Sequence, residues 1–351
     1  MAFLHFKNVG IRAVAACVPS DILTINSLTD LFTEKEAETF ISGTGVQEKR
    51  IASSGVCTSD LCYTAAKKLL EDNKISPDSI DAILFMSKTP DYIIPTTSAL
   101  LQDRLGLNKS VLAMDLRLAC SGYVYALSTA YAYASTEGID RVLLLCGDVN
   151  SKIVSRKDKS AFPVFGDGGS ATLIEKGDFA DSFFDFGTDG SRAFSVSIPS
   201  ENGGRNPITE NSLIKEADGN GNVRNQLQMN MHGMDVFSFA ISTVPKSIKS
   251  VIEFSKQQVC DIDNFFIHQA NRFIIQTVAK KLKSQMGKVP VNIDRFGNTS
   301  SASIPLLLCS EFYGQEAKIG KSCMCGFGSG LSWASAVQDL SGIKISKIVE
   351  I

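Results

Sequence analysis

Histidine is scarce in this sequence, with three in 351 residues. Catalysis by a Cys–His or Ser–His pair must therefore use His5, His232 or His268. Neither sign of charge is in excess, because 35 basic and 37 acidic residues give a formal net charge of −2. This balance argues against a general nucleic-acid-binding surface. No apolar run reaches the ~18 residues that a membrane-spanning helix needs.

Cysteine is frequent by contrast, with nine residues. Residues 1–7 lack the charged-then-apolar order of a secretory signal, so we expect a cytoplasmic protein with free thiols. Most of these cysteines should be small buried hydrophobic residues. The pairs Cys57/Cys62 and Cys323/Cys325 lack partner pairs at zinc-binding spacing, and we therefore expect no metal site.

The length predicts about two domains, and two parts of the chain share one order of elements. Each has a helix, an Ile-Asp segment and a fully apolar strand, over residues 59–86 and again from Pro245 to residue 267. Each then continues with strand, turn, helix and strand, over residues 113–146 and 291–325. This alternation predicts a duplicated α/β unit with parallel-type sheets covered by helices. Residues 201–228 are predicted to form an extended surface loop.

Cys120 is the first candidate for chemistry. It stands between the strand predicted at 113–116 and a helix of small residues predicted from Cys120 to Ala134. The dipole and free N–H groups of a helix N-terminus favour the thiolate form of a nearby cysteine. The alternative is an inert buried cysteine, which is the usual role of this residue type.

His268 and Asn298 also occupy positions where α/β proteins gather ligands. His268 directly follows the buried run 265–267, at the carboxyl end of a strand. Asn298 lies at the next predicted strand-to-helix turn. Taken singly, the position of His268 is typical of a core histidine, and that of Asn298 is typical of a turn and helix-capping residue. We expect no chemistry from His5 or His232, which lie in a terminal segment and at a helix start.

Two glycine-rich loops, 165–169 and 326–330, do not have the spacing of a dinucleotide or P-loop fingerprint. Their glycines are expected to permit positive φ or close backbone approach. The second loop could also direct backbone N–H groups at an oxyanion.

Four sequence blocks, taken in order, resemble those of one family: Ala119–Gly122, His268–Asn271, Gly297–Ser300 and Gly326–Gly330. They are similar to the motifs of β-ketoacyl-acyl carrier protein synthase III and its relatives in the thiolase superfamily. The resemblance covers nearly the whole chain. It implies an α/β fold, a thiolase-like five-layer α-β-α-β-α sandwich built from two duplicated halves. Residues 1–180 would carry the nucleophilic cysteine and residues 181–351 the histidine and asparagine, usually in a homodimer.

The resemblance also implies a mechanism. Cys120 would attack an acyl thioester, and His268 and Asn298 would then bind the carbonyl of a malonyl thioester carried by acyl carrier protein. The enolate formed as CO2 leaves would attack the acyl-cysteine and give a 3-oxoacyl thioester. The backbone N–H groups of Cys120 and, by position, Ser329 would form the oxyanion hole. No metal or redox cofactor is implied.

The coenzyme A site of the family is not matched. Thr39 and Gly43 stand where the family has a tryptophan and an arginine, and Lys159 stands where a second adenine-stacking arginine is expected. Lysine stacks less well than planar arginine. We therefore expect the primer to arrive on a carrier protein, or through an unusual mode of coenzyme A binding.

The resemblance assigns further residues to substrates and to carrier protein. Ile94 would reach across the dimer into the partner's acyl pocket, Phe327 would line the pocket near Cys120, and Asn271 would contact substrate. Arg272, Lys280 and Lys283 fall within ~80° on one predicted helix face and form a candidate docking patch for the acidic carrier protein, or a merely solvated face.

Two other functions fit the same motifs. A specialised relative could transfer the acyl group to another acceptor, or could build a polyketide, another secondary metabolite or a surface lipid. A non-catalytic partner with the same fold is a third reading, against which the retained Cys120 argues.

Overall fold

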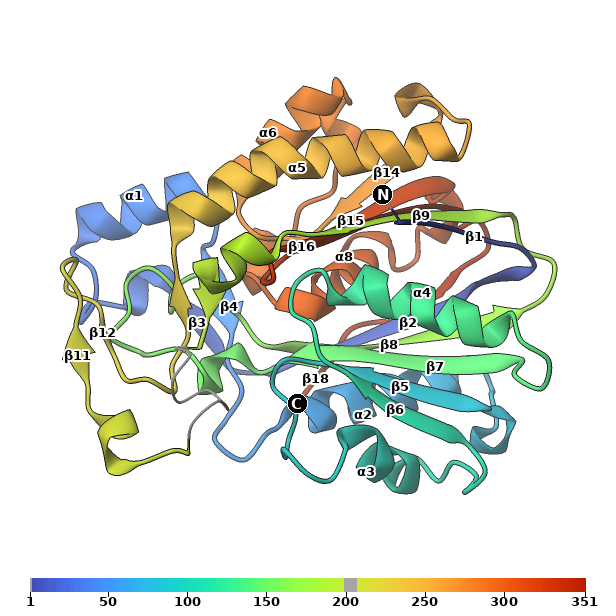
Figure 1. The fold of residues 1–351 in the computed structure, drawn as a ribbon, viewed down its shortest axis with the longest axis horizontal. Helices are drawn as coiled ribbons and strands as arrows, with labels where there is room; N and C mark the ends of the chain where they lie inside the picture. The colour runs from blue at the N-terminus through green and yellow to red at the C-terminus, as the bar shows by residue number, and fades with distance from the viewer. Residues whose placement is uncertain (1, 199–206) are drawn as a thin grey trace.

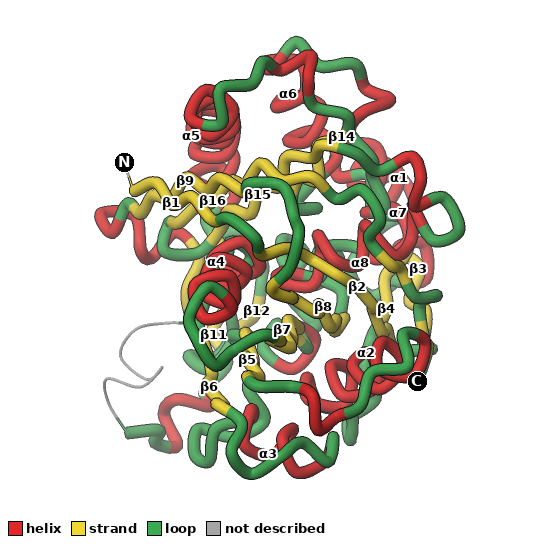
Figure 2. The backbone as a smooth tube through the Cα atoms, turned by 90° about the vertical axis from the view of Figure 1, so that its right-hand side faces the viewer, coloured by secondary structure: helices red, strands yellow, loops and turns green. Residues whose placement is uncertain are grey.

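The computed structural model describes residues 2–198 and 207–351 and shows two β-sheets stacked between three layers of helices (Figures 1 and 2). This arrangement is the five-layer α-β-α-β-α sandwich expected from the sequence. Of the predicted surface loop at 201–228, residues 201–206 lie outside the described residues. The remainder carries a small hairpin of the strands β11 (Glu216–Ala217) and β12 (Val223–Arg224).

The first sheet has the strand order β17-β2-β8-β7-β5-β6, with β18 also pairing with β2. Its central pairs β2–β8 and β7–β8 are antiparallel, whereas β5 pairs in parallel with β6 and β7. The sheet is therefore mixed, and the expectation of parallel-type sheets was wrong for its central pairs. Its strands are β2 (Val9–Val18), β5 (Ala82–Met86), β6 (Leu112–Leu116), β7 (Arg141–Asp148), β8 (Gly168–Lys176), β17 (Lys344–Ile345) and β18 (Val349–Glu350).

The second sheet has the order β1-β9-β16-β15-β14, in which only the β14–β15 pair is parallel. Fully apolar segments such as Phe265–Ile267 are buried here because helices cover both faces of the sheet. The strands are β1 (Ala2–Phe6), β9 (Ser182–Thr188), β14 (Asn264–Ile267), β15 (Lys321–Gly328) and β16 (Ser332–Asp339).

The helices are distributed over three layers. Helices α2 and α3 cover the outer face of the first sheet, α4 and α8 lie between the sheets, and α5 and α6 cover the outer face of the second sheet. Their bounds are α2 (Thr58–Asp72), α3 (Thr97–Arg104), α4 (Gly122–Ala134), α5 (Gly233–Phe254), α6 (Arg272–Leu282) and α8 (Ser303–Phe312).

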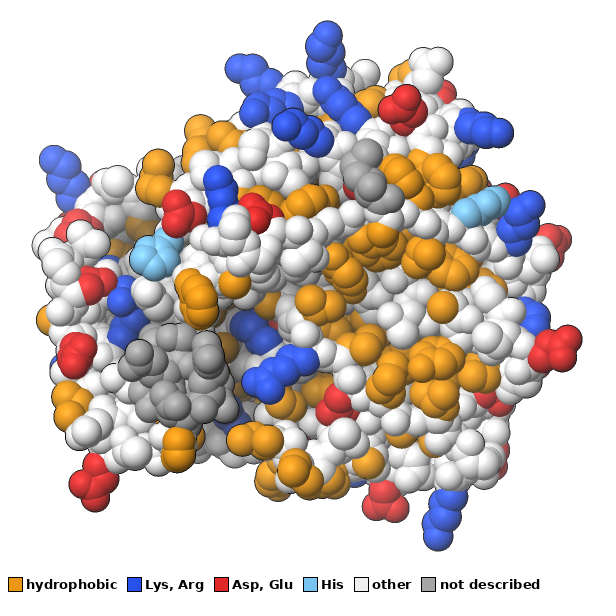
Figure 3. Space-filling model, viewed as in Figure 1, with side chains coloured by type: hydrophobic (Ala, Val, Ile, Leu, Met, Phe, Trp, Pro, Cys, Tyr) orange, Lys and Arg blue, Asp and Glu red, His pale blue; other side chains and the backbone are white. Residues whose placement is uncertain are grey.

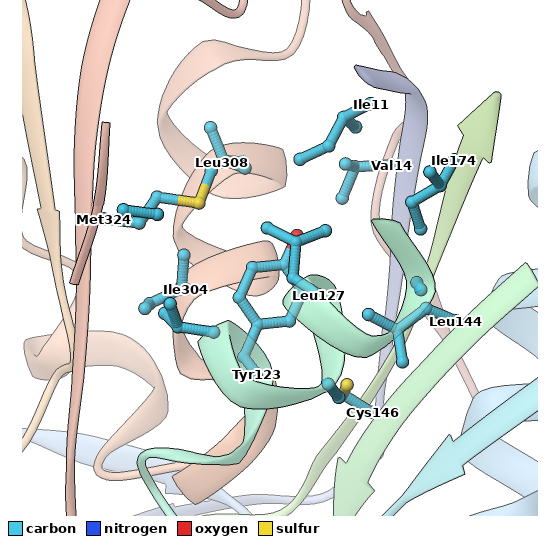
Figure 4. Close-up of a cluster of buried hydrophobic side chains, with 14 of the residues drawn as sticks. Ile11, Val14, Tyr123, Leu127, Leu144, Cys146, Ile174, Ile304, Leu308 and Met324 are labelled. Carbon is cyan, nitrogen blue, oxygen red and sulfur yellow. The ribbon is translucent and has the colours of Figure 1, made fainter. Parts of the chain in front are cut away.

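The central layer packs against both sheets, because α4 and α8 have a sheet above and below. Ala126, Ala130 and Ala134 keep α4 thin enough to fit there, while Leu127 and Tyr131 fill the remaining space. Figure 4 shows side chains of α4, α8 and both sheets meeting in this cluster. The central core thus fixes the N-termini of α4 and α8 relative to each other.

The remaining elements form one end of the molecule. Helix α1 follows Thr33, whose side chain and Glu36 make reciprocal N-cap hydrogen bonds. The short strands β3 and β4 pair with each other, as do β10 and β13. The bounds are α1 (Glu34–Thr44), α7 (Ile293–Phe296), β3 (Ile22–Thr24), β4 (Glu48–Arg50), β10 (Val196–Ser197) and β13 (Asn230–Met231).

Each sheet takes most of its strands from one half of the chain, but the termini cross over. Strand β1, at the N-terminus, belongs to the second sheet, and β17 and β18, near the C-terminus, belong to the first. The boundary expected at residues 180/181 falls between β8 and β9, which lie in different sheets.

Two local expectations were wrong. The helix start expected at His232 is confirmed, but the helix expected from Pro245 is not separate: Pro245 lies inside α5, which begins at Gly233. Residues Val291–Asp294 do not form the second-half counterpart of β6, because Ile293 starts the one-turn helix α7. The duplicated order of elements is therefore less regular in the second half than the sequence suggested.

Candidate active site

Cys120 lies on the turn between β6 and α4, two residues before the first residue of the helix. Its side chain is half-buried beneath the end of β15. A Cβ atom placed on Gly328 would come within 2.8 Å of the Cys120 Cβ atom and 3.4 Å of its sulfur. Glycine at this position therefore allows β15 to pass directly over the thiol.

The thiol of Cys120 contacts a hydroxyl from the second half of the chain. Its Sγ lies 3.5 Å from Oγ of Ser300, in the short helical turn Ser300–Ala302 (η9) that precedes α8. Burial raises the pKa of Cys120 above its usual value, although the positive charge of Lys88 and the Ser300 hydrogen bond lower it in part. Lys88 and Ser300 therefore offset part of the cost of burying a thiolate at Cys120.

His268 follows β14 directly, as predicted, and is buried with 1% of its surface exposed. Its Nδ1 lies 2.6 Å from Oγ of Ser303, the first residue of α8. Burial, and next the charge of Lys88, lower the pKa of His268 to about 3. The imidazole is therefore neutral at physiological pH and retains one N–H donor.

Asn298 lies in the loop before η9 and is 5% exposed. Its Oδ1 accepts the backbone N–H of Ser300 at 2.8 Å, which orients the amide NH2 as the remaining donor. The backbone of Asn298 pairs with that of Phe165 in the first glycine-rich loop, so this loop fixes the position of the asparagine. The turn from Asn298 to Ser303 thus contacts both Cys120 and His268 and brings all three predicted residues into one site.

Four residues at this site were missed by the sequence reasoning: Lys88, Asp148, Asn150 and Ser300. Nζ of Lys88 lies 2.7 Å from Oγ of Ser300, 2.6 Å from Oδ1 of Asn150 and 3.5 Å from Oδ2 of Asp148. Lys88 follows β5 by two residues, and Asp148 ends β7. The rule that singled out His268, which seeks polar residues at the carboxyl ends of buried strands, would have found both.

The other residues predicted to contact substrate differ in how close they lie to Cys120. Ser329 follows Gly328 and therefore lies next to the strand end that covers Cys120. Phe327 is buried and packs edge-to-face on the His268 ring at 5.3 Å, on the face of β15 opposite to Gly326 and Gly328. Its place in the acyl pocket remains a prediction.

Asn271 and Ile94 have contrasting environments. Oδ1 of Asn271 caps α6 by accepting the N–H groups of Phe273 and Ile274, so this residue has a structural task. Ile94 is 85% exposed on the loop between β5 and α3, and its neighbour Ile93 is 92% exposed. Nothing within the described chain covers this loop tip.

The predicted coenzyme A positions lie on or near α1. Thr39 and Gly43 are residues of that helix, and a Cβ atom on Gly43 would have no neighbour within 4 Å. Nζ of Lys159 lies 3.4 Å from a carboxylate oxygen of Glu36 on the same helix. The charge of Lys159 is therefore directed at α1.

The basic side chains expected on one helix face do not form a regular face. Helix α6 ends at Leu282, and Lys283 adopts a left-handed cap conformation with φ of 55°, so it leaves the helical periodicity. Arg272 is half-buried against Gly45 at the end of α1, whereas Lys280 and Lys283 are exposed. Figure 3 shows Lys and Arg side chains gathered over the α5–α6 layer, at the top of that view.

The other two histidines lie away from this site. His5 pairs with Asp181 at 2.7 Å and stacks on Phe183, and His232 precedes α5. Within residues 2–198 and 207–351, no group of three or more His, Cys, Asp or Glu residues is arranged to hold a metal ion. No described helix is long and apolar enough to cross a membrane.

Comparison with known proteins gives a consistent result. Family models described as 3-oxoacyl-[acyl-carrier-protein] synthase III and as its C-terminal part match residues 114–190 and 252–340. The chain is 34% identical to β-ketoacyl-[acyl-carrier-protein] synthase III of Rhodopirellula baltica, over 95% of this chain and 99% of that protein. It is 32% identical to the enzyme of the same name from Desulfitobacterium hafniense, over 94% and 97%.

A solved structure agrees with this similarity along the full length. The crystal structure of 3-oxoacyl-(acyl-carrier protein) synthase from Burkholderia xenovorans superposes with a TM-score of 0.92 at 34% identity, over 100% of this chain and 99% of that one. Because the family models, the relatives and the solved structure all agree, we conclude that the chain belongs to the β-ketoacyl-acyl carrier protein synthase III family of thiolase-fold condensing enzymes.

Proposed function

We propose that the protein catalyses the decarboxylative condensation of an acyl primer with malonyl-acyl carrier protein. The observation that carries the proposal is the turn from Asn298 to Ser303, which contacts the Cys120 thiol and the neutral His268 ring. A nucleophile and two neutral hydrogen-bond donors are the groups that acyl transfer and enolate formation require.

The first step is acylation of Cys120. The thiolate attacks the carbonyl carbon of the acyl thioester, and the carrier thiol leaves. The backbone N–H groups of Cys120 and Ser329 stabilise the oxyanion, which is supported by the position of Ser329 beside Gly328. In the second step His268 and Asn298 bind the malonyl thioester carbonyl while the carboxylate leaves as CO2. The resulting enolate carbon attacks the acyl-cysteine and releases the Cys120 thiolate. Cys120 and the two thioester substrates supply every reacting group, and the proposal includes no metal or redox cofactor.

The identity of the primer carrier is part of the proposal. Thr39, Gly43 and Lys159 lack the planar groups that would hold an adenine ring, and the charge of Lys159 is engaged by Glu36. We therefore propose delivery by a carrier protein, or a mode of coenzyme A binding that does not use these positions.

We also propose that the protein works as a homodimer. Strand β6 is an edge strand, paired only with β5 among the described strands, and its apolar Leu112, Met114 and Leu116 are half-buried. Figure 3 shows apolar side chains gathered on this face around α4. The exposed Ile93 and Ile94 on the neighbouring loop would be covered by a partner, with Ile94 reaching the partner's acyl pocket.

One experiment tests the reaction and the carrier together. The protein is incubated with a panel of acyl-coenzyme A and acyl-carrier-protein donors, and acylation of the Cys120 peptide is detected by mass spectrometry. We expect acylation from carrier protein, no acylation of a Cys120→Ser control at that peptide, and release of 3-oxoacyl product when malonyl-acyl carrier protein is added. Acylation of Cys120 without any condensation would favour transfer to another acceptor, and an inert Cys120 would contradict the proposal.

A further inference from the structure

Lys88 is linked to the thiol of Cys120 through a single hydroxyl group. Nζ of Lys88 lies 2.7 Å from Oγ of Ser300, and that oxygen lies 3.5 Å from Sγ of Cys120. An ammonium group has donors only, so the Ser300 oxygen accepts from Lys88 and keeps its own hydrogen available for donation. Once Cys120 is ionised, its sulfur is an acceptor within reach of the Ser300 hydroxyl hydrogen.

The ammonium group is fixed in place. It also donates to Oδ1 of Asn150 at 2.6 Å, and its side chain is only 17% exposed. The backbone N–H of Lys88 donates to Oδ1 of Asp148 at 2.9 Å, which anchors the segment from which the side chain extends. Lys88 therefore differs from an ordinary solvated lysine, whose flexible side chain has a weak and screened effect.

Ser300 is held in the orientation that the link requires. It is fully buried, and its backbone has a φ of 54°, a left-handed conformation that non-glycine residues rarely adopt. Its N–H donates to Oδ1 of Asn298, which stabilises this conformation. Such backbone conformations are found preferentially at functional sites, where surrounding contacts maintain them.

We propose that Lys88 and Ser300 form a relay that stabilises the Cys120 thiolate. In the thiol form, Cys120 donates to the Ser300 oxygen. On ionisation, the thiol proton passes to water, Ser300 rotates its hydroxyl hydrogen toward the sulfur, and Lys88 keeps its proton while donating to Ser300. Lys88 is thus a positioning residue, and Ser300 is the group that touches the reacting sulfur. The inference rests on the proposed role of Cys120 as the nucleophile.

The charges that face Cys120 allow this role. Lys88 after β5 lowers the pKa of the thiol, Asp148 on β7 raises it by a smaller effect, and His268 after β14 is neutral. The Asp148 carboxylate is engaged by the N–H and hydroxyl of Ser301, at 3.2 and 2.8 Å. The Lys88 ammonium is therefore the charge connected to the sulfur through Ser300, whereas the Asp148 carboxylate accepts hydrogen bonds from Ser301.

The test measures alkylation of Cys120 by iodoacetamide as a function of pH, followed on the Cys120 peptide by mass spectrometry of the full-length protein. Lys88→Gln should move the midpoint upward by about one pH unit, with about tenfold slower alkylation near neutral pH and an unchanged plateau at high pH. Lys88→Arg retains the charge and should keep the midpoint close to that of the wild type. Lys152→Gln is a matched control, because its Nζ lies 3.2 Å from a different thiol, Cys57.

Ser300→Gly tests the relay without altering the Lys88–Asp148 pair, and glycine accepts the left-handed backbone. We expect the same upward movement of the midpoint, so the relay remains testable if Lys88→Gln does not fold. An unchanged midpoint in the folded Lys88→Gln or Ser300→Gly protein would overturn the inference. Alkylation needs no acyl donor and therefore tests the relay independently of the reaction. If alkylation shows the predicted pH profile but the protein never condenses thioesters, only the proposed function is contradicted.

Discussion

The hydroxyl of Ser303 lies 2.6 Å from Nδ1 of His268, at the first residue of α8. A hydroxyl that donates to Nδ1 leaves the ring hydrogen on Nε2, which can then donate to a substrate carbonyl. The hydrogen bond to the central helix therefore orients the histidine ring, while the strand β14 supplies its position, and we expect the Ser303 hydroxyl to be the donor.

Ser303→Ala should slow the release of CO2 from malonyl-acyl carrier protein by about fivefold, because one orienting hydrogen bond contributes about 1 kcal/mol. Stopped assays of CO2 release measure the effect, and Cys120 acylation should change less than decarboxylation. Ser310→Ala, which removes a hydroxyl farther along the same helix, is the control. Wild-type decarboxylation in Ser303→Ala would show that the tautomer is fixed by another group.

The depressed pKa of His268 predicts an acid-dependent loss of stability. The folded protein keeps this ring neutral down to a pKa of about 3, whereas an unfolded histidine binds a proton near pH 6.5. The unfolded state therefore binds more protons between these values, and the free energy of unfolding falls as the pH decreases through this window. Urea unfolding of the wild type and of His268→Gln isolates the effect. The pH dependence should be shallower in the variant, and identical slopes would contradict the assignment.

Gly328→Ala should strongly impair acylation of Cys120. The added methyl group would lie 2.8 Å from the Cys120 Cβ atom, closer than folded structures allow, so either the strand end or the nucleophile must move. We expect at least a hundredfold loss of acylation rate by mass spectrometry, because misplacing a reacting group by an ångström has effects of about this size. Gly43→Ala on α1, where a methyl group meets nothing within 4 Å, should acylate normally.

The exposed lysines near the end of α6 provide a test of carrier-protein docking. Replacing Lys280 and Lys283 by Glu should raise the KM for malonyl-acyl carrier protein several-fold, and high salt should reduce the difference, because rim charges act mainly through electrostatic attraction. Decarboxylation of a small malonyl thioester should be unaffected. The same substitutions at Lys67 and Lys74, exposed around α2, serve as the control. An unchanged KM would remove α6 from the docking surface.

Much of the architecture was predictable because burial leaves a clear pattern in the sequence. The short apolar runs Ala82–Met86 and Phe265–Ile267 predicted strands covered on both faces, and both are. Pro245 is an exception to its usual pattern, because proline is typical of a helix start but lies inside α5 here. The strand expected at residues 291–294 rested on analogy with the first half, and their own sequence carries no strand pattern.

The site was predictable to the level of Cys120, His268 and Asn298, and less so for the groups behind them. Lys88 and Ser300 belong to opposite halves of the chain, and only the tertiary structure shows that they touch. A lysine two residues beyond a strand is ordinarily a solvated side chain, and its burial depends on Asn150 and Asp148, which lie far along the sequence.

The crossing of the termini has a consequence for how the protein is made. The sheet beneath Cys120 receives β17 and β18 only from the last residues of the chain, while β1 waits at the N-terminus for β9 and the second sheet. During synthesis, the edge of β2 that pairs with β17 and β18 therefore stays unpaired until residues 344–350 have left the ribosome. Each half of the chain therefore completes its sheet only with a strand supplied by the other half.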